Sequence, residues 1–278
     1  MKEKQLSVGE IPYTNCFPIF YNLRHRCELS GVRFVAGSPA CLNAALRKGE
    51  LDLCPSSSIE YARHPEGYLL LPRFCIGSVK TIWSIRLFSR LPIEQLDRKT
   101  VVLTGESDTS VILCRIILGR FMGFDNEFKT EIIDLEQALE KADAVLLIGD
   151  RALAAGRRVG NLYSYDLGSI WHQQTGLPFV FALWTLREKA ARTHAELLKE
   201  FWRAMCEAHR SISPPDEELV RSALKAKPFL TPTLVKEYWR MISYELSQDH
   251  LKGLKLFYSL GNEIGALESQ PEIRFYEL

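Results

Sequence analysis

The sequence predicts an α/β protein with two lobes, a central ligand cleft and helices at its C-terminal end. For the first two-thirds of the chain, short apolar runs alternate with helical patterns, which is typical of a mainly parallel sheet. After Arg187 the pattern becomes helical throughout, and no Gly/Ser-rich linker separates the two parts. Two lobes without a linker are expected to be joined by strands that cross from one lobe to the other.

The individual strands and helices follow from this alternation. The helix expected at 109–121 comes after the polar turn "TGESDTS", and the strand at 144–148 is apolar throughout. Pro214 and Pro215 break the helical region after Ser211 and restart it, with acidic residues in the new first turn. Strands are expected at 7–12, 32–36, 51–54, 83–89, 100–103, 144–148 and 179–186, and helices at 18–26, 39–48, 109–121 and 188–211, with another that opens at 56–58.

Two of these strands are the candidates for the crossings, near residues 84–89 and 180–185. The chain would leave the first lobe at one and return at the other. The first lobe is then predicted from residues 1–85 and 188–278, and the second from residues 90–180. The C-terminal helices are expected to cover the first lobe.

Composition and charge exclude several classes of protein. With 278 residues, 46% of them hydrophobic, the chain is long enough for a sizeable core. A formal net charge of +1 gives no electrostatic reason to expect a nucleic acid or an anionic membrane as partner. No apolar segment approaches the roughly 18–20 residues of a membrane span, and "MKEKQLSVGEI" lacks the apolar stretch of a secretory signal. The expected location is cytoplasmic.

The sequence carries no pattern for a metal or a nucleotide. Its seven cysteines are odd in number and never spaced as C-x-x-C, so neither a disulfide framework nor a structural zinc site is predicted. The six histidines form no metal-ligand cluster. Neither a Walker P-loop nor G-x-G-x-x-G occurs. We therefore expect no cofactor and no metal.

The opening stretch "VGEIPYTNCFPIFYNL" contains the first candidate contact residue. A strand ends there at Asn15 and Cys16, and the chain turns through Pro18 into an apolar helix. Strand-to-helix turns of α/β proteins are places where ligands are held. Asn15 is therefore interpreted as a ligand contact, with a turn-only role as the alternative, whereas Cys16 is expected to pack in the interior.

"CPSSSIEYA" is a second candidate, because Ser56 and Ser57 lie between a buried strand and a helix. Free N–H groups at a helix start, with hydroxyls beside them, can bind an anion or a carboxylate. Ordinary N-capping is the alternative for this stretch, with Ser57 or Ser58 as the cap and Glu60 as capping-box partner.

"LTGESDTSVILCRIIL" repeats the strand, polar turn and helix later in the chain. Capping is again the alternative. Two such turns that face each other across a cleft would suit a small molecule with two negative charges. The candidate residues here are Ser107, Thr109 and Ser110.

No conventional catalytic base or nucleophile is evident. His172 lies beside Trp171 in "GSIWHQQTGLPFVFALW", where a structural or surface role is favoured over a role as base. Neither a serine nucleophile elbow nor Cys/His protease spacing occurs. If the protein is an enzyme, its catalysis is expected to depend on binding and polarisation.

Several stretches taken together resemble one family. They are "IPYTNCFPIFY", "GSPACLNAALRKGELDLCPSSSIEYA", "WSIRLFSRLPIEQL", "VVLTGESDTSVILCRIIL", "ADAVLLIGDRAL" and "YDLGSIWHQQTGLPFVFALW". This combination resembles the chorismate dehydratases of the futalosine route to menaquinone, whose fold is that of type II periplasmic binding proteins. The matches run in family order from residue 8 to residue 184. Thr14 and Lys80 depart from the family pattern, and the C-terminal third carries no matched motif.

Two other functions remain open at this stage. The sister enzyme of the same route, dihydroxynaphthoate synthase, shares the fold but carries a histidine near the "LIGD" region. Gly149 and Asp150 stand there in this chain, which favours the dehydratase. The other alternative is a non-catalytic protein that binds small carboxylates, and the lack of a signal sequence counts against a transport receptor.

The resemblance implies a cofactor-independent hydro-lyase that converts chorismate to 3-[(1-carboxyvinyl)oxy]benzoate. Asn15 and Ser84 are the implied catalytic residues. Because no protein base is matched, the resemblance implies that the substrate's own enolpyruvyl carboxylate takes the proton. We expect Asn15, Ser57 and Thr109 to face one common cleft. The predicted substrate-binding residues are Ser56, Ser57, Ser107, Thr109, Ser110, Gly149 and Asp150.

Overall fold

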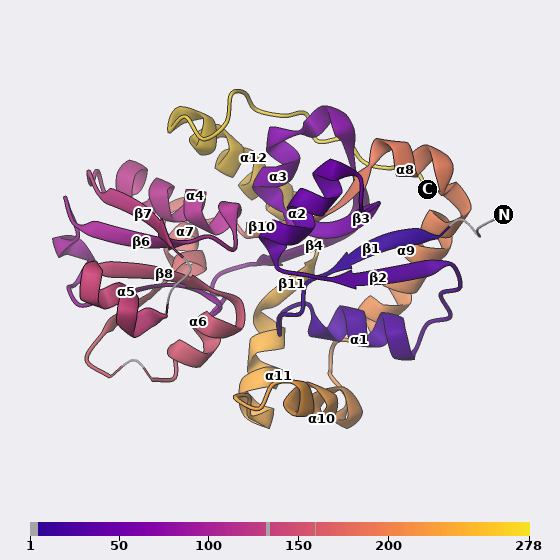
Figure 1. Ribbon diagram of the computed structural model, residues 1–278, viewed down its shortest axis with the longest axis horizontal. Coiled ribbons are helices and arrows are strands. Elements are labelled where there is room, and N and C mark those ends of the chain that lie inside the picture. Colours follow the sequence, from indigo (N-terminus) through magenta and orange to yellow (C-terminus); the bar gives the residue numbers. More distant parts are fainter. Residues whose placement is uncertain (1–4, 132–133, 159) are drawn as a thin grey trace. The chain divides into compact units, whose positions relative to one another are not determined.

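The computed structural model describes residues 5–131, 134–158 and 160–278, and the chain divides into two compact units (Figure 1). Unit 1 comprises Met1–Ile76, Ala182–Leu246 and Pro271–Leu278, and unit 2 comprises Gly77–Phe181 and Ser247–Gln270. Each unit is built on its own sheet with helices packed against it. The predicted α/β class is confirmed.

Unit 1 is organised around a six-stranded sheet in the order β11-β4-β10-β3-β1-β2. β1 runs parallel to β2 and β3, whereas β10 is antiparallel to β3. Trp184 of β10 is buried and contacts Phe20 of α1 and Phe201 of α9, so the aromatic core lies against this sheet. The strands are β1 (Leu6–Glu10), β2 (Val32–Ala36), β3 (Leu53–Ser57), β4 (Tyr68–Ser78), β10 (Phe179–Arg187) and β11 (Ile242–Glu245), and the helices are α1 (Phe17–His25), α2 (Pro39–Lys48), α3 (Ser58–Arg63), α8 (Glu188–Thr193), α9 (Ala195–Arg210), α10 (Glu217–Ala226) and α11 (Pro232–Met241).

Unit 2 contains a five-stranded sheet in the order β7-β6-β8-β5-β9. β6 runs parallel to β7 and β8, and β5 is antiparallel to β8 and β9. Trp171 is fully buried and contacts Phe179 and Phe257. The strands are β5 (Ile85–Ser89), β6 (Thr100–Thr104), β7 (Glu127–Glu131), β8 (Ala144–Ile148) and β9 (Tyr163–Asp166), and the helices are α4 (Asp108–Arg115) with the π-helical continuation η3 (Ile116–Phe121), α5 (Leu135–Lys141), α6 (Gly149–Ala155), α7 (Leu167–Thr175) and α12 (Gln248–Glu263).

The first passage from unit 1 to unit 2 lies in β4, between Ile76 and Gly77, and not at 84–89 as the sequence suggested. β5 belongs entirely to unit 2. β4 was not predicted, because Pro72 removes a ladder donor and makes the run read as interrupted. Arg73, the next residue, has φ of 80°, so the strand is distorted there. The passage in β10 falls between Phe181 and Ala182.

The C-terminal region also differs from the expected division. Residues 247–270 were assigned to the first lobe, but α12 lies in unit 2. There Gly253 approaches the chain so closely that an added Cβ would lie 2.1 Å from the Pro178 carbonyl oxygen. The last residues return to unit 1, where the Leu70 N–H donates to the Arg274 carbonyl and the Tyr276 N–H donates to the Leu70 carbonyl. Such long-range packing leaves no local sequence pattern.

The helix expected at 188–211 is interrupted. It forms two helices, α8 and α9, with His194 between them. α2, in contrast, occupies the predicted residues. Ser38 caps its first turn by accepting a hydrogen bond from the Cys41 N–H, and Gly49 ends it with φ of 78°. Strong local caps therefore made this helix predictable.

Candidate functional site

The loop between β1 and α1 that carries Asn15 is held by side chains from the C-terminal third of the chain. The Trp239 indole N–H donates to the Thr14 carbonyl at 2.8 Å, and the Tyr244 hydroxyl donates to the Asn15 carbonyl at 2.7 Å. Burial holds the pKa of Tyr244 well above that of a free tyrosine, so its hydroxyl remains a donor at neutral pH. The backbone of Asn15 is therefore fixed by partners that the motif comparison could not find.

The side chain of Asn15 is not satisfied in the same way. Its amide oxygen Oδ1 is buried but has no hydrogen-bond partner among the described residues. A buried acceptor without a donor costs about 1–3 kcal/mol, and nearly all such groups in native proteins are paired. Asn15 Oδ1 is thus an acceptor that a ligand could satisfy.

Ser56 and Ser57 lie at the end of β3, and both hydroxyls bind the buried amide of Asn43 on α2. The Ser56 hydroxyl donates to Asn43 Oδ1 at 2.6 Å, and Asn43 Nδ2 donates to the Ser57 hydroxyl at 2.8 Å. Ser56 has therefore used its single donor hydrogen, whereas the Ser57 hydroxyl donates to no partner among the described residues. The capping alternative is wrong for Ser57, because its side chain makes no cap hydrogen bond.

Glu60 is not a capping-box partner. Its side chain is fully buried, forms an ion pair with Arg47 of α2 and accepts a hydrogen bond from the Tyr68 hydroxyl at 3.1 Å. Burial and the neighbouring Glu60 carboxylate raise the pKa of Tyr68, so the phenol remains a donor to that carboxylate. The stretch that looked like a cap is instead a buried polar connection between α2 and α3.

The second serine-rich turn does cap its helix. Ser107 precedes α4, and its hydroxyl accepts from the Ser110 N–H at 3.4 Å and lies 3.2 Å from the Ser110 hydroxyl. Thr109 and Ser110 are both buried in the first turn of the helix. The capping alternative is confirmed here with Ser107 as the cap, and substrate binding by these residues stays a prediction.

A backbone hydrogen bond connects Ser84 and Gly149, which belong to different matched motifs. The Gly149 N–H donates to the Ser84 carbonyl at 2.8 Å, and Ser84 is 2% exposed. Gly149 has φ of 59°, a conformation in which a side chain would be strained. It begins α6, and the partly exposed Asp150 follows in the first turn.

Within each unit two of the candidates lie at the carboxyl ends of neighbouring parallel strands. Asn15 follows β1 and Ser57 ends β3, and these two strands are parallel neighbours. Gly149 follows β8 and Thr109 follows β6, which are likewise parallel neighbours. This is the edge at which open α/β sheets bind ligands. That Asn15, Ser57 and Thr109 face a common cleft stays a prediction.

No described residue holds the Nδ1 of His172, so nothing there orients the ring as a base. It lies on α7, and its Nδ1 is buried without a hydrogen-bond partner in the part of the chain that the structure describes. The neighbouring Trp171 donates from its indole nitrogen to the Pro178 carbonyl at 3.3 Å. A catalytic histidine usually has one ring nitrogen held by a second group. His172 lacks that arrangement.

Three of the buried cysteines, Cys54, Cys75 and Cys114, are not activated. Burial raises the pKa of Cys114 to about 12 and those of Cys54 and Cys75 further, so their thiols stay protonated. Cys16 is buried as expected. Among residues 5–131, 134–158 and 160–278, no three His, Cys, Asp or Glu side chains are placed to share a metal ion. No helix in the same residues combines the length and apolar character needed to cross a membrane.

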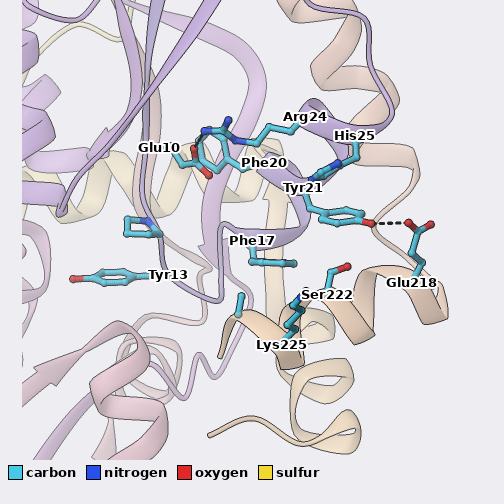
Figure 2. Close-up of a pocket in the computed structure, with 12 residues that line it drawn as sticks. Glu10, Tyr13, Phe17, Phe20, Tyr21, Arg24, His25, Glu218, Ser222 and Lys225 are labelled. Atoms are coloured by element: carbon cyan, nitrogen blue, oxygen red, sulfur yellow. Dashed lines mark hydrogen bonds and ion pairs between the residues drawn. The ribbon is translucent and has the colours of Figure 1, made fainter. Parts of the chain in front are cut away.

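A groove of about 580 Å³ lies in unit 1 between α1 and α10 (Figure 2). Four of its polar side chains bind one another in pairs. Arg24 pairs with Glu10, and the Tyr21 hydroxyl donates to Glu218 at 3.0 Å. None of the predicted site residues is among the described residues that line it. We therefore do not assign the substrate to this groove.

The fold is shared with several solved structures, some of them binding proteins. A protein from Archaeoglobus fulgidus aligns with a TM-score of 0.79 over 96% of this chain and 100% of its own, at 22% identity. The alkanesulfonate-binding protein SsuA of Xanthomonas axonopodis aligns with a TM-score of 0.70 over 99% and 97%, at 14% identity. The periplasmic-binding-protein-like fold implied by the resemblance is confirmed.

The family is shown by sequence. A family model described as menaquinone biosynthesis matches residues 6–263. A chorismate dehydratase of Thermus thermophilus is 32% identical over 88% of this chain and 94% of its own length. A chorismate dehydratase of Campylobacter jejuni is 41% identical over 69% and 72%. The chain therefore belongs to the chorismate dehydratase family of menaquinone biosynthesis.

Proposed function

We propose that this protein is a hydro-lyase that converts chorismate to 3-[(1-carboxyvinyl)oxy]benzoate and water. The observation that carries the proposal is the match to a curated chorismate dehydratase over nearly the whole of both chains. The unsatisfied amide oxygen of Asn15, at the ligand-binding edge of a sheet, supports it. Sheet edges of this kind place loop side chains around small ligands.

The reaction removes the ring proton on the carbon that carries the enolpyruvyl ether, and the hydroxyl on the neighbouring carbon leaves. The electron pair of the broken C–H bond enters the ring and is delocalised to the ring carboxylate. Loss of the C–O bond then makes the ring aromatic, and the proton and the hydroxyl together account for the water. Charge develops on the ring carboxylate in the first step, so donors aimed at that group lower the barrier.

Asn15 orients the substrate in this proposal. Its buried Oδ1 can accept a hydrogen bond from the substrate hydroxyl, and its amide N–H groups can donate to the enolpyruvyl group. A neutral amide adds no charge that would compete with two substrate carboxylates. Ser84 is proposed as a second contact. Holding the reacting groups in place accounts for several kcal/mol of barrier in well-oriented reactions, roughly 7–11 at the limit.

No protein base is required in this mechanism, because the enolpyruvyl carboxylate of the substrate takes the proton. Replacing His172 with glutamine is therefore expected to lower kcat by less than about 10-fold, whereas loss of a general base costs about 10²–10⁴-fold. Steady-state kinetics and thermal unfolding of His172→Gln are the measurement. A variant that is folded but has lost its activity would show that His172 acts in the chemistry.

Turnover is expected to need no metal and no added nucleotide. The test is to incubate the purified protein with chorismate and follow loss of the diene absorbance, before and after exhaustive chelation. We expect the same rate in both samples. Activity that disappears with the chelator and returns with one particular metal would contradict cofactor independence. A protein that binds chorismate and never consumes it would instead be a binding protein.

A further inference from the structure

Asp166, at the end of β9, holds the loop that leads from β4 into β5. Its carboxylate accepts hydrogen bonds at Oδ2 from the Thr81 hydroxyl at 2.8 Å, the Ile82 N–H at 3.1 Å and the Trp83 N–H at 2.7 Å. At Oδ1 it accepts from the Ser169 N–H at 2.9 Å, which caps α7. One side chain therefore fixes consecutive residues of the loop and attaches them to a helix start.

The conformation that these bonds hold is unfavourable by itself. Trp83 has φ of 58°, which is a genuine outlier for a bulky residue and therefore a strained conformation. Such a conformation persists only where the surroundings determine it, and the short bond from the Trp83 N–H to Asp166 does so. Ser84 is the next residue. Its N–H donates to the Ile82 carbonyl at 2.7 Å, so its position follows from that of the loop.

Gly168 allows the loop to approach α7. A Cβ added at this position would lie 3.0 Å from the Lys80 carbonyl oxygen, 3.2 Å from the Ser78 hydroxyl and 3.3 Å from Asp166 Oδ1. Any side chain would therefore push the loop away from the helix. Asp166 and Gly168 belong to the matched stretch "YDLGSIW", to which the sequence comparison assigned no role at these positions.

We propose that Asp166 is a positioning residue for the reaction and acts through Ser84. The inference rests on the proposed function, because it gives Ser84 a contact with chorismate. Asp166 has four donors to its carboxylate and needs no contact with the substrate. Its effect is to hold the strained turn at Trp83, so that Ser84 stays in one place while the reaction proceeds. Preorganisation of this kind matters because a shift of about 1 Å in a catalytic group can cost 10²-fold in rate.

The test is a double-mutant cycle on kcat with Asp166→Asn and Ser84→Ala. Asparagine has nearly the same shape, but its amide nitrogen cannot accept from the N–H donors that now converge on the carboxylate. We expect Asp166→Asn alone to lower kcat by about 10- to 100-fold with little change in KM. In the Ser84→Ala background the same change should cost less than about 3-fold, because the group that Asp166 positions is already gone. A purely structural role would give equal losses in both backgrounds.

Asp143→Asn is the matched control. Asp143 precedes β8, at the opposite end of that strand from Gly149, and accepts a hydrogen bond from the Thr100 N–H at 3.1 Å. It is also a carboxylate that binds backbone in unit 2, but it lies in a different loop. We expect the kcat of the Asp143→Asn variant to stay within about 2-fold of the kcat of the unsubstituted protein. Thermal unfolding of every variant shows whether a loss of rate reflects a loss of folded protein.

The outcomes separate the inference from the proposed function. If the unchanged protein does not consume chorismate, the proposed function fails. If it does, but Ser84→Ala keeps full activity, or the losses in the cycle multiply independently, the positioning role of Asp166 is overturned while the dehydratase assignment stands. Should Asp166→Asn not fold, Gly168→Ala displaces the same loop by steric contact, and its cycle with Ser84→Ala decides the question in the same way.

Discussion

Replacing Asn15 with leucine is expected to lower kcat/KM for chorismate by about 100-fold or more. Leucine has a similar volume, but it removes the amide that would bind the substrate and leaves the polar groups of the substrate facing an apolar side chain. The backbone should change little, because Tyr244 holds the Asn15 carbonyl, which leucine retains. Steady-state kinetics measure the effect, and thermal unfolding measured alongside establishes that the variant is folded.

The division of that loss between kcat and KM shows when Asn15 acts. A loss mainly in kcat means that the amide binds the transition state more strongly than the substrate, and a loss mainly in KM means that it only anchors the substrate. Asn262→Leu is the control, because Asn262 is an exposed amide in unit 2 that donates to the Leu267 carbonyl. It should leave kcat/KM within about 2-fold. Near-normal activity of Asn15→Leu would show that the Asn15 side chain does not contact the substrate.

Arg47→Met is expected to lower the free energy of unfolding by about 3 kcal/mol. Glu60 is fully buried, and Arg47 is its ion-pair partner, 42% exposed. Removing one partner of a buried pair leaves an uncompensated charge and costs about 3–5 kcal/mol. The partial exposure of Arg47 and the remaining hydrogen bond from Tyr68 to Glu60 place the effect at the lower end. Urea unfolding followed by circular dichroism measures it.

Arg192→Met provides the comparison for that change. Arg192 pairs with Glu188 at 2.8 Å on the surface of α8, and its side chain is 77% exposed. Exposed pairs contribute about 0–1 kcal/mol, so the same substitution should be nearly silent. Equal effects of the two variants on unfolding would show that burial of Glu60 does not govern the strength of its interaction with Arg47.

The sequence predicted those elements whose determinants are local. β2, α2 and β8 occupy the residues expected, because their apolar patterns are short, regular and bounded by caps or glycine. β4 could not be predicted, because Pro72 interrupts the strand pattern in the sequence. The strand forms nevertheless, with a left-handed residue at Arg73, because it pairs with β10 on one side and β11 on the other. Missing β4 displaced the expected boundary between the two lobes by several residues.

The residues of the candidate site likewise fall into those that a local motif predicts and those that only the fold brings into place. Asn15, Ser84 and Gly149 stand out because each lies in a short matched motif where a strand begins or has just ended. Their supports do not: Tyr244, which holds the Asn15 carbonyl, lies 229 residues away in the chain. Asp166 lies 83 residues from the Trp83 N–H that it binds. Spacing within a sequence carries no information about contacts of this range, which the fold alone creates.

The mass of the product formed from chorismate tests the dehydratase assignment most directly. Purified protein should yield a single aromatic product that is lighter than chorismate by one water and still carries the enolpyruvyl group, which identifies 3-[(1-carboxyvinyl)oxy]benzoate. A product of unchanged mass would mean rearrangement, and release of pyruvate would mean cleavage of the ether. Either of these results, or chorismate recovered intact from a folded and ligand-bound protein, would contradict the account.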